Sequence, residues 1–275
     1  MQSKVERQSG AQEDHALLWL YGVMPNERAI LPQVADVEGR LNYRLVCTAR
    51  LAALVARVPA DEYDESHLQP HMDDQAWLVP RVLAFSATVA DVFAHTVILP
   101  ARFGTVFSSQ QHLAEVLVAD ETSLVDRLQH LQGREEWGLK IFAHVDRYLA
   151  DEVSRTLAEL GNAAGSGGRL HFMKKKLATT LQTRVRDAIQ ARALSIHESL
   201  LKEGYPADVG QNPAPEHLDN GAVLLLKTAY LVTSDARRHF LAVVSELADA
   251  SAPTFDLVPT GPWVPYSFAA LAPSD

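Results

Sequence analysis

The stretch from Thr96 to Phe107, TVILPARFGTVF, is the part of the sequence on which the fold prediction depends. Its residues up to Leu99 are mostly β-branched, and Arg102-Phe103-Gly104 separates them from a second short run. β-branched and aromatic residues favour strands, whereas proline and glycine interrupt them. The pattern predicts two short strands joined by a tight turn.

A further strand is predicted over Glu135–Phe142, EEWGLKIF. Because side chains alternate between the two faces of a strand, Trp137, Leu139 and Ile141 share one face and Lys140 lies on the other. This strand and the first stretch are candidates for pairing in one sheet.

Composition predicts a globular, acidic chain. Its 275 residues are enough for two domains of ordinary size, and a hydrophobic content of 47% allows both domains to bury a core. The formal net charge is -9, whereas binding to nucleic acid or anionic lipid requires clustered Lys and Arg. Neither nucleic acid nor a lipid membrane is therefore an expected partner.

The single cysteine and the polar start of the chain predict a soluble, cytoplasmic protein. Cys47 has no second cysteine to pair with, and its neighbour Val46 indicates a small, buried apolar residue. Residues 1–15 do not resemble a signal peptide. The longest apolar run, Ala16–Met24, is about half of the ~20 residues that a membrane-spanning helix needs.

In the first half of the chain, apolar periodicity and turn residues predict three strands, an acidic loop and three helices. The first of these helices begins at Asp73 or Asp74, and its apolar face consists of Leu78, Val82, Phe85, Val89, Val92 and Phe93. The predicted elements are strands Ala16–Val23, Leu41–Cys47 and Leu51–Val58, the loop Pro59–Met72, this helix, a helix from Ser108 or Ser109 to Val118, and a helix Leu124–Leu131 ending at Gly133.

The second half is predicted to contain more helix. A long helix from Arg169 to about Glu203 follows a glycine-rich, flexible connector at Gly161–Gly168. The other predicted elements are a helix Tyr148–Leu160, a loop Pro206–Asn220, a strand Val223–Val232, a helix capped by Ser234 or Asp235 that runs to Leu247, and a strand Thr254–Val258.

Strands and helices mixed in this order, without long βαβ repeats, predict an α+β fold in which helices pack against largely antiparallel sheets. We place the domain boundary at Gly133. The predicted regions are a polar N-terminal extension (1–15), an N-terminal α+β domain (16–133), a C-terminal α+β domain with a long helix (134–259) and a C-terminal tail (260–275). No internal sequence repeat is obvious.

The motifs resemble those of the GvpL/GvpF gas vesicle proteins, which carry an Arg-Phe-Gly turn and a Glu-Trp-Gly-Leu-Lys strand. The resemblance extends from about Leu17 to Phe268 and is most specific in the closing TGPWVPYSF, where Val264 replaces an expected proline. It implies that the N-terminal domain is ferredoxin-like. The motif residues, which we expect to be structural, are Arg102, Phe103, Gly104, Glu136, Trp137, Gly138, Lys140, Tyr230, Gly261, Pro262, Trp263, Pro265, Tyr266 and Phe268.

Two clusters are candidates for ligand binding, and both are better explained without a ligand. His67 and His71, followed by Asp73 and Asp74, offer metal-ligand types, but Pro70 disturbs their helical spacing, so we expect a solvated acidic loop. The glycines at positions 165, 167 and 168 precede a helix without completing a phosphate-binding loop, and the lysines at 174–176 are expected on a solvated face. We predict no metal and no cofactor.

The sequence nominates no catalytic group. It contains none of the common nucleophile or metallopeptidase motifs. Glu135 and Glu136 are adjacent in a strand and point to opposite faces, so we expect charged strand ends rather than an acid–base pair. Trp137, Trp263 and Tyr266 are expected to be packing anchors.

The resemblance implies a non-enzymatic accessory protein of gas vesicle assembly, located in the cytoplasm and associated with the vesicle. Its expected partners are the small hydrophobic shell protein of the GvpA type, whose nucleation it assists or whose aggregation it prevents, and other accessory proteins. The alternative is a ligand-binding regulatory module built on ferredoxin-like domains.

Overall fold

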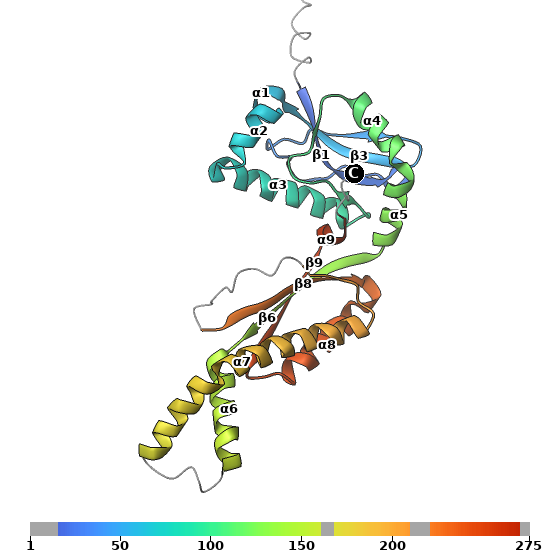
Figure 1. The fold of residues 1–275 in the computed structure, drawn as a ribbon. Coiled ribbons are helices and arrows are strands. Elements are labelled where there is room, and N and C mark those ends of the chain that lie inside the picture. The colour runs from blue at the N-terminus through green and yellow to red at the C-terminus, as the bar shows by residue number, and fades with distance from the viewer. Residues whose placement is uncertain (1–15, 161–167, 210–220, 270–275) are drawn as a thin grey trace, which may run out of the picture. The chain divides into compact units, whose positions relative to one another are not determined.

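The computed structural model of the chain describes residues 16–160, 168–209 and 221–269 (Figure 1). The described residues form two compact units, the first containing 16–133 and 264–269 and the second containing the remainder of 134–263. The predicted N-terminal extension lies outside the described residues. So do the connector at 161–167 and the segment 210–220 of the predicted loop.

The first unit is built on an antiparallel sheet with strand order β2-β3-β1-β4. β1 (Ala16–Pro25) pairs with β3 (Leu51–Pro59), which in turn pairs with β2 (Tyr43–Cys47). On its other side β1 pairs with two short strands, β4 (Leu99–Pro100) and β5 (Val106–Phe107). The prediction of the first three strands is confirmed.

The two short strands and the tight turn predicted within Thr96–Phe107 are present, but the strands do not pair with each other as a hairpin. β4 and β5 both pair antiparallel with β1, opposite successive parts of it, so they run in the same direction and form one interrupted edge strand. The Arg102-Phe103-Gly104 segment is therefore an excursion between the two halves of that strand. Each half of this edge strand is only two residues long. A local pattern of apolar and turn residues cannot show that both halves pair with β1 rather than with each other.

The predicted acidic loop is also wrong, because residues 60–71 form two short helices, α1 (Ala60–Tyr63) and α2 (Glu65–His71). Helix α2 begins where the Asp64 carboxylate accepts a hydrogen bond from the His67 amide at 3.0 Å. Tyr63 and Leu68 are buried, so each helix turns one apolar side chain inward. The free energy gained by burying these two side chains favours helices here, although the polar composition of the segment is typical of a loop.

The three predicted helices of this unit are present. Asp74 caps α3 (Gln75–Phe93) by accepting from the Ala76 amide, and Ser109 caps α4 (Gln110–Ala119) by accepting from the His112 amide. The last is α5 (Glu121–Leu131). Side-chain capping satisfies amide groups that have no partner within the helix, which makes these starts predictable.

Both faces of the first sheet are covered. Trp19 and Tyr21 on β1 pack against Phe85 of α3, with ring centroids 6.4 Å and 5.3 Å apart. The alternate residues Leu18 and Leu20 are buried as well, and α4 and α5 contact β2 and β1. This double coverage explains why β1 reads as a continuous apolar run.

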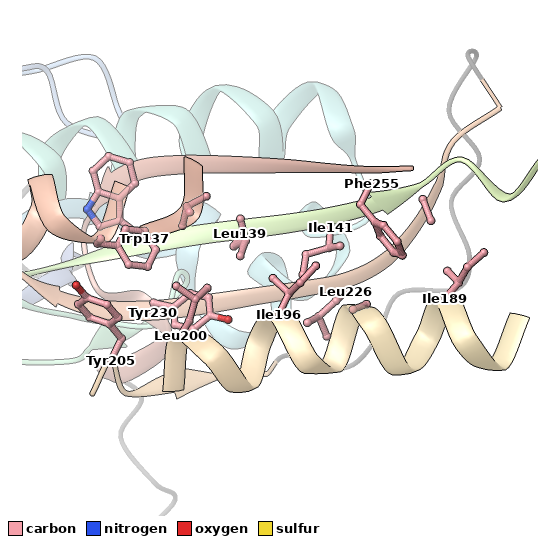
Figure 2. Close-up of a cluster of buried hydrophobic side chains, with 14 of the residues drawn as sticks. Trp137, Leu139, Ile141, Ile189, Ile196, Leu200, Tyr205, Leu226, Tyr230 and Phe255 are labelled. Atoms are coloured by element: carbon pink, nitrogen blue, oxygen red, sulfur yellow. The ribbon is translucent and has the colours of Figure 1, made fainter. Parts of the chain in front are cut away.

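The second unit contains an antiparallel sheet of order β7-β8-β6-β9. Its strands are β6 (Arg134–Ala143), β7 (Ala207–Asp208), β8 (Val223–Thr233) and β9 (Phe255–Trp263). Trp137, Leu139 and Ile141 point from β6 into one core, as predicted (Figure 2). The expected pairing of β6 with the Thr96–Phe107 stretch is wrong, because the two belong to different sheets.

Helices α6 (Val145–Leu160), α7 (Gly168–Lys202) and α8 (Arg237–Asp249) complete the second unit. Figure 2 shows Ile196 and Leu200 of α7 pointing at the sheet residues of the core. The predicted cap at Ser234 or Asp235 is wrong, because these residues form a 3-10 turn before α8. The helices themselves follow the predicted spacing.

The structure confirms the α+β class with antiparallel sheets and helices, whereas the ferredoxin-like description of the first unit stays a prediction. Between β1 and β2 the only helical segment is the 3-10 turn η1 (Asn26–Arg28). The chain also ends differently from expectation. β9 continues to Trp263, and α9 (Tyr266–Ala269) lies in the first unit.

Cys47 is exposed, contrary to prediction. β2 is an edge strand in which Tyr43 and Val46 are buried on opposite faces, whereas Cys47, its last residue, is exposed. Neighbouring residues of a strand point to opposite faces, so the burial of Val46 does not establish that Cys47 is buried.

Candidate functional site

The Arg-Phe-Gly motif forms a tight turn against the first core. The Thr105 amide donates to the Arg102 carbonyl at 3.1 Å and closes the turn. Phe103 packs edge to face on Trp19, with centroids 5.0 Å apart. Gly104 has φ +86°, and a Cβ there would lie 2.8 Å from the terminal methyl of Met72. The motif thus positions Phe103 and requires glycine for its backbone conformation.

The Glu-Trp-Gly motif and the closing motif meet in the second unit. β6 pairs with β9, so that Glu136 is opposite Trp263 and Gly138 is opposite Thr260. A Cβ on Gly138 would lie 2.7 Å from Thr260 Oγ1, and one on Gly261 would lie 3.1 Å from the Trp137 ring. Both glycines allow close approach of the two strands.

Tyr230 lies opposite Trp137 on the neighbouring strand β8 and is fully buried. Its hydroxyl is 2.7 Å from His197 Nδ1 on α7. Burial lowers the pKa of His197, and the charge of Glu198 opposes that shift. The pair ties the long helix to the sheet, and a protonated His197 is disfavoured there.

The sequence predicted that Glu135 is a charged strand end, and the structure shows that its carboxylate is buried. The carboxylate accepts hydrogen bonds from Arg237 at 2.7 and 2.5 Å and from Trp137 Nε1 at 2.7 Å. Burial opposes ionisation, but the bonds from Arg237 and Trp137 outweigh it and hold the pKa of Glu135 below its usual value. One sequence signal could have predicted this burial. Trp137, two residues later in the strand, lies on the same face as Glu135, and its indole N–H needs an acceptor when it is buried.

Three of the four side chains of the predicted metal-like cluster, those of His67, His71 and Asp74, make other contacts. His67 Nδ1 is 2.8 Å from Asp64, His71 stacks on Trp77 with centroids 4.7 Å apart, and Asp74 caps α3. In residues 16–160, 168–209 and 221–269, no three His, Cys, Asp or Glu side chains are placed to hold a metal ion. Of the candidate phosphate-binding glycines, only Gly168 is described, and it begins α7.

The candidate interaction surface is the outer side of α3, here called the α3 face. Only five of the 19 residues of α3 are buried. The face includes Val82, which the sequence placed on the buried side but which is 37% exposed, together with Val79 at 50% and Leu83 at 64%. The remaining exposed residues of the face are Ala76, Pro80, Ser86, Ala87 and Ala90.

The α3 face carries no charge because both charged residues of the helix are held at its sides. Arg81 lies over the Trp77 ring at 4.2 Å and donates to Glu62 at 2.8 Å. Asp91 accepts a hydrogen bond from the Gln33 amide at 2.8 Å. Within the described residues α3 is also the one helix with the length and hydropathy of a membrane span, which is weak evidence for a membrane.

A residue of the closing motif adjoins the α3 face. Tyr266 of α9 is 39% exposed and lies close to the Ser86 hydroxyl of α3. Burial raises the pKa of Tyr266 to about 12, and the neighbouring Ser86 hydroxyl partly opposes the rise. The side chain therefore remains neutral and extends the uncharged surface.

The first unit also has a polar hollow of about 740 Å³ at the start of β1 and the end of β3. Arg40, Arg57, Asp61, Asp64 and His67 are among its lining residues. It differs from the α3 face in carrying charges of both signs.

Taken by fold, the chain is a two-unit α+β protein with one uncharged, apolar helix face. Its sequence matches the family "Gas vesicle synthesis protein GvpL/GvpF" over residues 17–270. The chain therefore belongs to the GvpL/GvpF family, which associates it with gas vesicles and involves it in their synthesis.

Relatives named gas vesicle protein L and gas vesicle protein F are similar to this chain. Gas vesicle protein L of a Streptomyces species is 29% identical over 263 residues, covering 94% of this chain and 95% of that protein. Gas vesicle protein F of the same organism is 31% identical over 258 residues, covering 91% and 98%. Gas vesicle protein F2 of Halobacterium salinarum is 23% identical, covering 92% of each.

Two crystal structures share the fold. GvpF from an Anabaena species superposes with a TM-score of 0.64 at 14% sequence identity, covering 94% of this chain and 97% of that one. GvpF from Microcystis aeruginosa gives 0.58 at 15% identity, covering 93% and 99%. At these identities the likeness concerns the fold alone.

Proposed function

We propose that this protein is a non-enzymatic accessory factor of gas vesicle assembly that binds the small hydrophobic shell protein of the GvpA type. Binding would assist nucleation of the shell or prevent aggregation of its subunit. The observation that carries the proposal is the α3 face, since exposed apolar patches on soluble domains mark interaction sites. Family membership supplies the biological setting.

The chemistry of the α3 face suits an apolar partner. Val79, Val82 and Leu83 are already partly exposed, so covering each contributes about 1 kcal/mol. No carboxylate or ammonium group has to be desolvated, because Arg81 and Asp91 are engaged at the sides of the helix. Binding should therefore change little with salt.

The proposed location is the cytoplasm at the gas vesicle, and the other proposed partners are further accessory proteins. The 14 motif residues are proposed to be structural, because Phe103 and Trp137 pack cores and Gly104, Gly138 and Gly261 permit a turn or a close approach of strands. Trp263 at 56% and Tyr266 at 39% are exposed and are not fully buried packing anchors. The proposed domain division follows the two units, with residues 264–269 assigned to the first.

The test is gene deletion in a gas-vesicle-forming host, complemented with variants. Deletion should abolish or cripple vesicle formation, and the wild-type gene should restore it. The double variant Val79→Lys/Leu83→Lys should fail to restore vesicles and should lose co-purification with the shell protein, because two ammonium groups would have to be desolvated at the contact.

The matched control is Val118→Lys, which changes a residue of α4 that is 63% exposed. It should support vesicles and shell-protein binding at both ~0.15 and ~0.5 M salt. Buoyant vesicles in the deletion strain, with no second related gene present, would reject the assembly role. Full binding by the double variant would reject the α3 face as the contact.

A second candidate is a ligand-binding regulatory module built on ferredoxin-like domains. The polar hollow favours it, because Arg40, Arg57, Asp61 and Asp64 are among the residues that line a space large enough for a metabolite. Mass spectrometry of the protein after gentle purification would test it. A bound metabolite whose retention depends on Arg40 would favour regulation over assembly.

A further inference from the structure

Helix α7 carries a concentration of positive charge that the rest of the chain lacks. Gly168–Arg186 contains six basic residues and no Asp or Glu. The whole chain has 25 basic and 34 acidic residues, so the other residues carry 19 and 34, a formal charge of -15. This segment is thus a basic surface on a strongly acidic protein.

The packing of α7 divides this half of the helix into a buried and an exposed stripe. Leu181, Val185 and Ile189 are buried, and α6 contributes Val153 and Leu157 to the same core. Figure 1 shows α6 and α7 running side by side away from the sheet. Because one stripe of α7 is committed to this core, the opposite stripe is left for solvent or a partner.

The exposed stripe, here called the α7 face, recurs every three or four residues. Its members are all exposed, and they are Phe172, Lys175, Lys176, Thr179, Gln182, Thr183 and Arg186. Lys174 and Arg184 are also exposed on α7, but outside this stripe. From Phe172 to Arg186 the stripe is about 21 Å long, which four turns of a second helix would cover.

Among residues 16–160, 168–209 and 221–269, the basic groups of the α7 face have no ion-pair partner. In the part of the chain that the structure describes, the ion pair of α6 joins Arg155 to Glu152 at 3.0 Å, and no carboxylate lies within 4.0 Å of a basic group of the face. The Thr179 hydroxyl donates to the Lys175 carbonyl at 3.1 Å, so the hydroxyl is satisfied locally. The lysine and arginine nitrogens are the groups that remain for a partner.

We infer that the α7 face docks an acidic, amphipathic helix of a partner protein. Carboxylates three or four residues apart on such a helix can reach Lys175, Lys176 and Arg186. Phe172 is 69% exposed and offers an apolar contact at one end of the stripe. Complementary charge mainly sets specificity and association rate.

A nucleic acid is the other polyanion that this surface could attract. The charge of -15 on the remaining residues repels a long polyanion, whereas a helix of about four turns contacts the basic segment alone. The basic face also has only one exposed aromatic residue, and base stacking on single strands uses several. These observations favour the acidic helix.

The probe for this inference is a 16-residue designed helical peptide with Glu on one face and Leu at its edge. A scrambled peptide of equal composition is compared with it, together with a 20-nucleotide single strand and a 20-base-pair duplex. The full-length protein should bind the helical peptide at least about tenfold more tightly than any of these, and affinity should fall as salt rises.

The decisive variant is Lys175→Glu/Lys176→Glu/Arg186→Glu, and its control is Arg44→Glu/Arg50→Glu/Lys202→Glu, which makes the same change in net charge at exposed sites elsewhere. The first variant should weaken peptide binding at least about tenfold and the control less than about twofold. Circular dichroism should show equal helix content in both. Equal affinities of the two variants, equal binding of the scrambled peptide, or tighter binding of an oligonucleotide would overturn the inference.

Discussion

The two units have the same strand order and differ in how the strands are connected. In each sheet the second strand lies at one edge, followed by the third, the first and the fourth, and every pairing is antiparallel. The first two strands are connected through α6 and α7 in the second unit, but through residues 26–42, without an α-helix, in the first. One sheet order is therefore compatible with very different connections.

Polar side chains hold the connection of the first unit in place of a helix. The buried Val37 amide donates to the Tyr21 hydroxyl at 3.0 Å. The buried Asp36 carboxylate accepts from the amides of Glu38 and Arg40 at 2.9 and 2.8 Å. Side-chain oxygens thus accept hydrogen bonds from backbone N–H groups that would donate to backbone carbonyls in a helix.

The units also differ in chain continuity. The second unit is one continuous segment, whereas the first is completed by residues that follow Trp263. Val264 is buried in the first core, and Arg127 donates to the Ala269 carbonyl. We therefore expect perturbations to act on one unit at a time, and hydrogen exchange measured by mass spectrometry can resolve them.

The largest expected effect is that of ending the chain at Trp263. The first unit would lose the buried Val264 and the Tyr266 contact with Ser86, costing about 3 kcal/mol or more. Amides of β1 and β3 should exchange faster while those of β6 and β8 stay protected. A chain ending at Ala269 is the control and should match the full-length protein. Unchanged protection of β1 in the shorter chain would show that residues 264–269 do not support the first unit.

The second largest effect is expected for Gly104→Val, which should lower the free energy of unfolding of the first unit by about 2 kcal/mol and leave the second unit unchanged. The positive φ of +86° is strained for any residue with a Cβ, and a β-branched side chain adds crowding against Met72. Gly39→Val is the matched comparison, because φ there is +73° with no atom within 4 Å of the new Cβ. Chemical denaturation should show that the Gly104→Val variant is less stable than the Gly39→Val variant. The reverse order of stability would mean that packing around the turn is unimportant.

Glu135→Leu tests the second unit and should destabilise it by about 1–2 kcal/mol. It leaves the buried Trp137 indole N–H without its acceptor. Glu135→Gln retains an oxygen acceptor for the Trp137 indole and should therefore lose less stability than Glu135→Leu. If both variants lowered the midpoint of urea unfolding equally, the hydrogen bond to Trp137 would not be the source of the effect.

The smallest effect concerns pH and the second unit. Burial lowers the pKa of His197 in the folded state, so the unfolded state binds the proton first as pH falls below about 6.5. The contribution of this residue to stability is therefore present at neutral pH and is lost as pH falls through and below that value. His197→Gln should flatten the decline in melting temperature between pH 7.5 and 5.5. A parallel decline in both proteins would assign the pH dependence to other groups.

Local signals predicted most of the elements and some of the site. The β-branched runs predicted β1 to β3, Asp74 and Ser109 marked helix starts, and the alternation around Trp137 predicted its buried face. The predictions for Cys47 and the Glu135 carboxylate are wrong. Cys47 is exposed because of its place in the edge strand β2, and the Glu135 carboxylate is buried together with its hydrogen bond from Arg237, which is far away in sequence.

The sequence by itself determined the family, the α+β class and most element positions, because these follow from local composition, periodicity and capping. Only the tertiary structure decided that β4 and β5 share β1 as partner, that residues 264–269 complete the first unit, and that α3 and α7 each leave one face uncovered. The physical reason is that pairing and burial are settled between residues distant in the chain. Apolar periodicity of α3 shows that part of the helix is buried, but the engagement of Arg81 with Glu62 and Tyr63 determines that its outer face is uncharged.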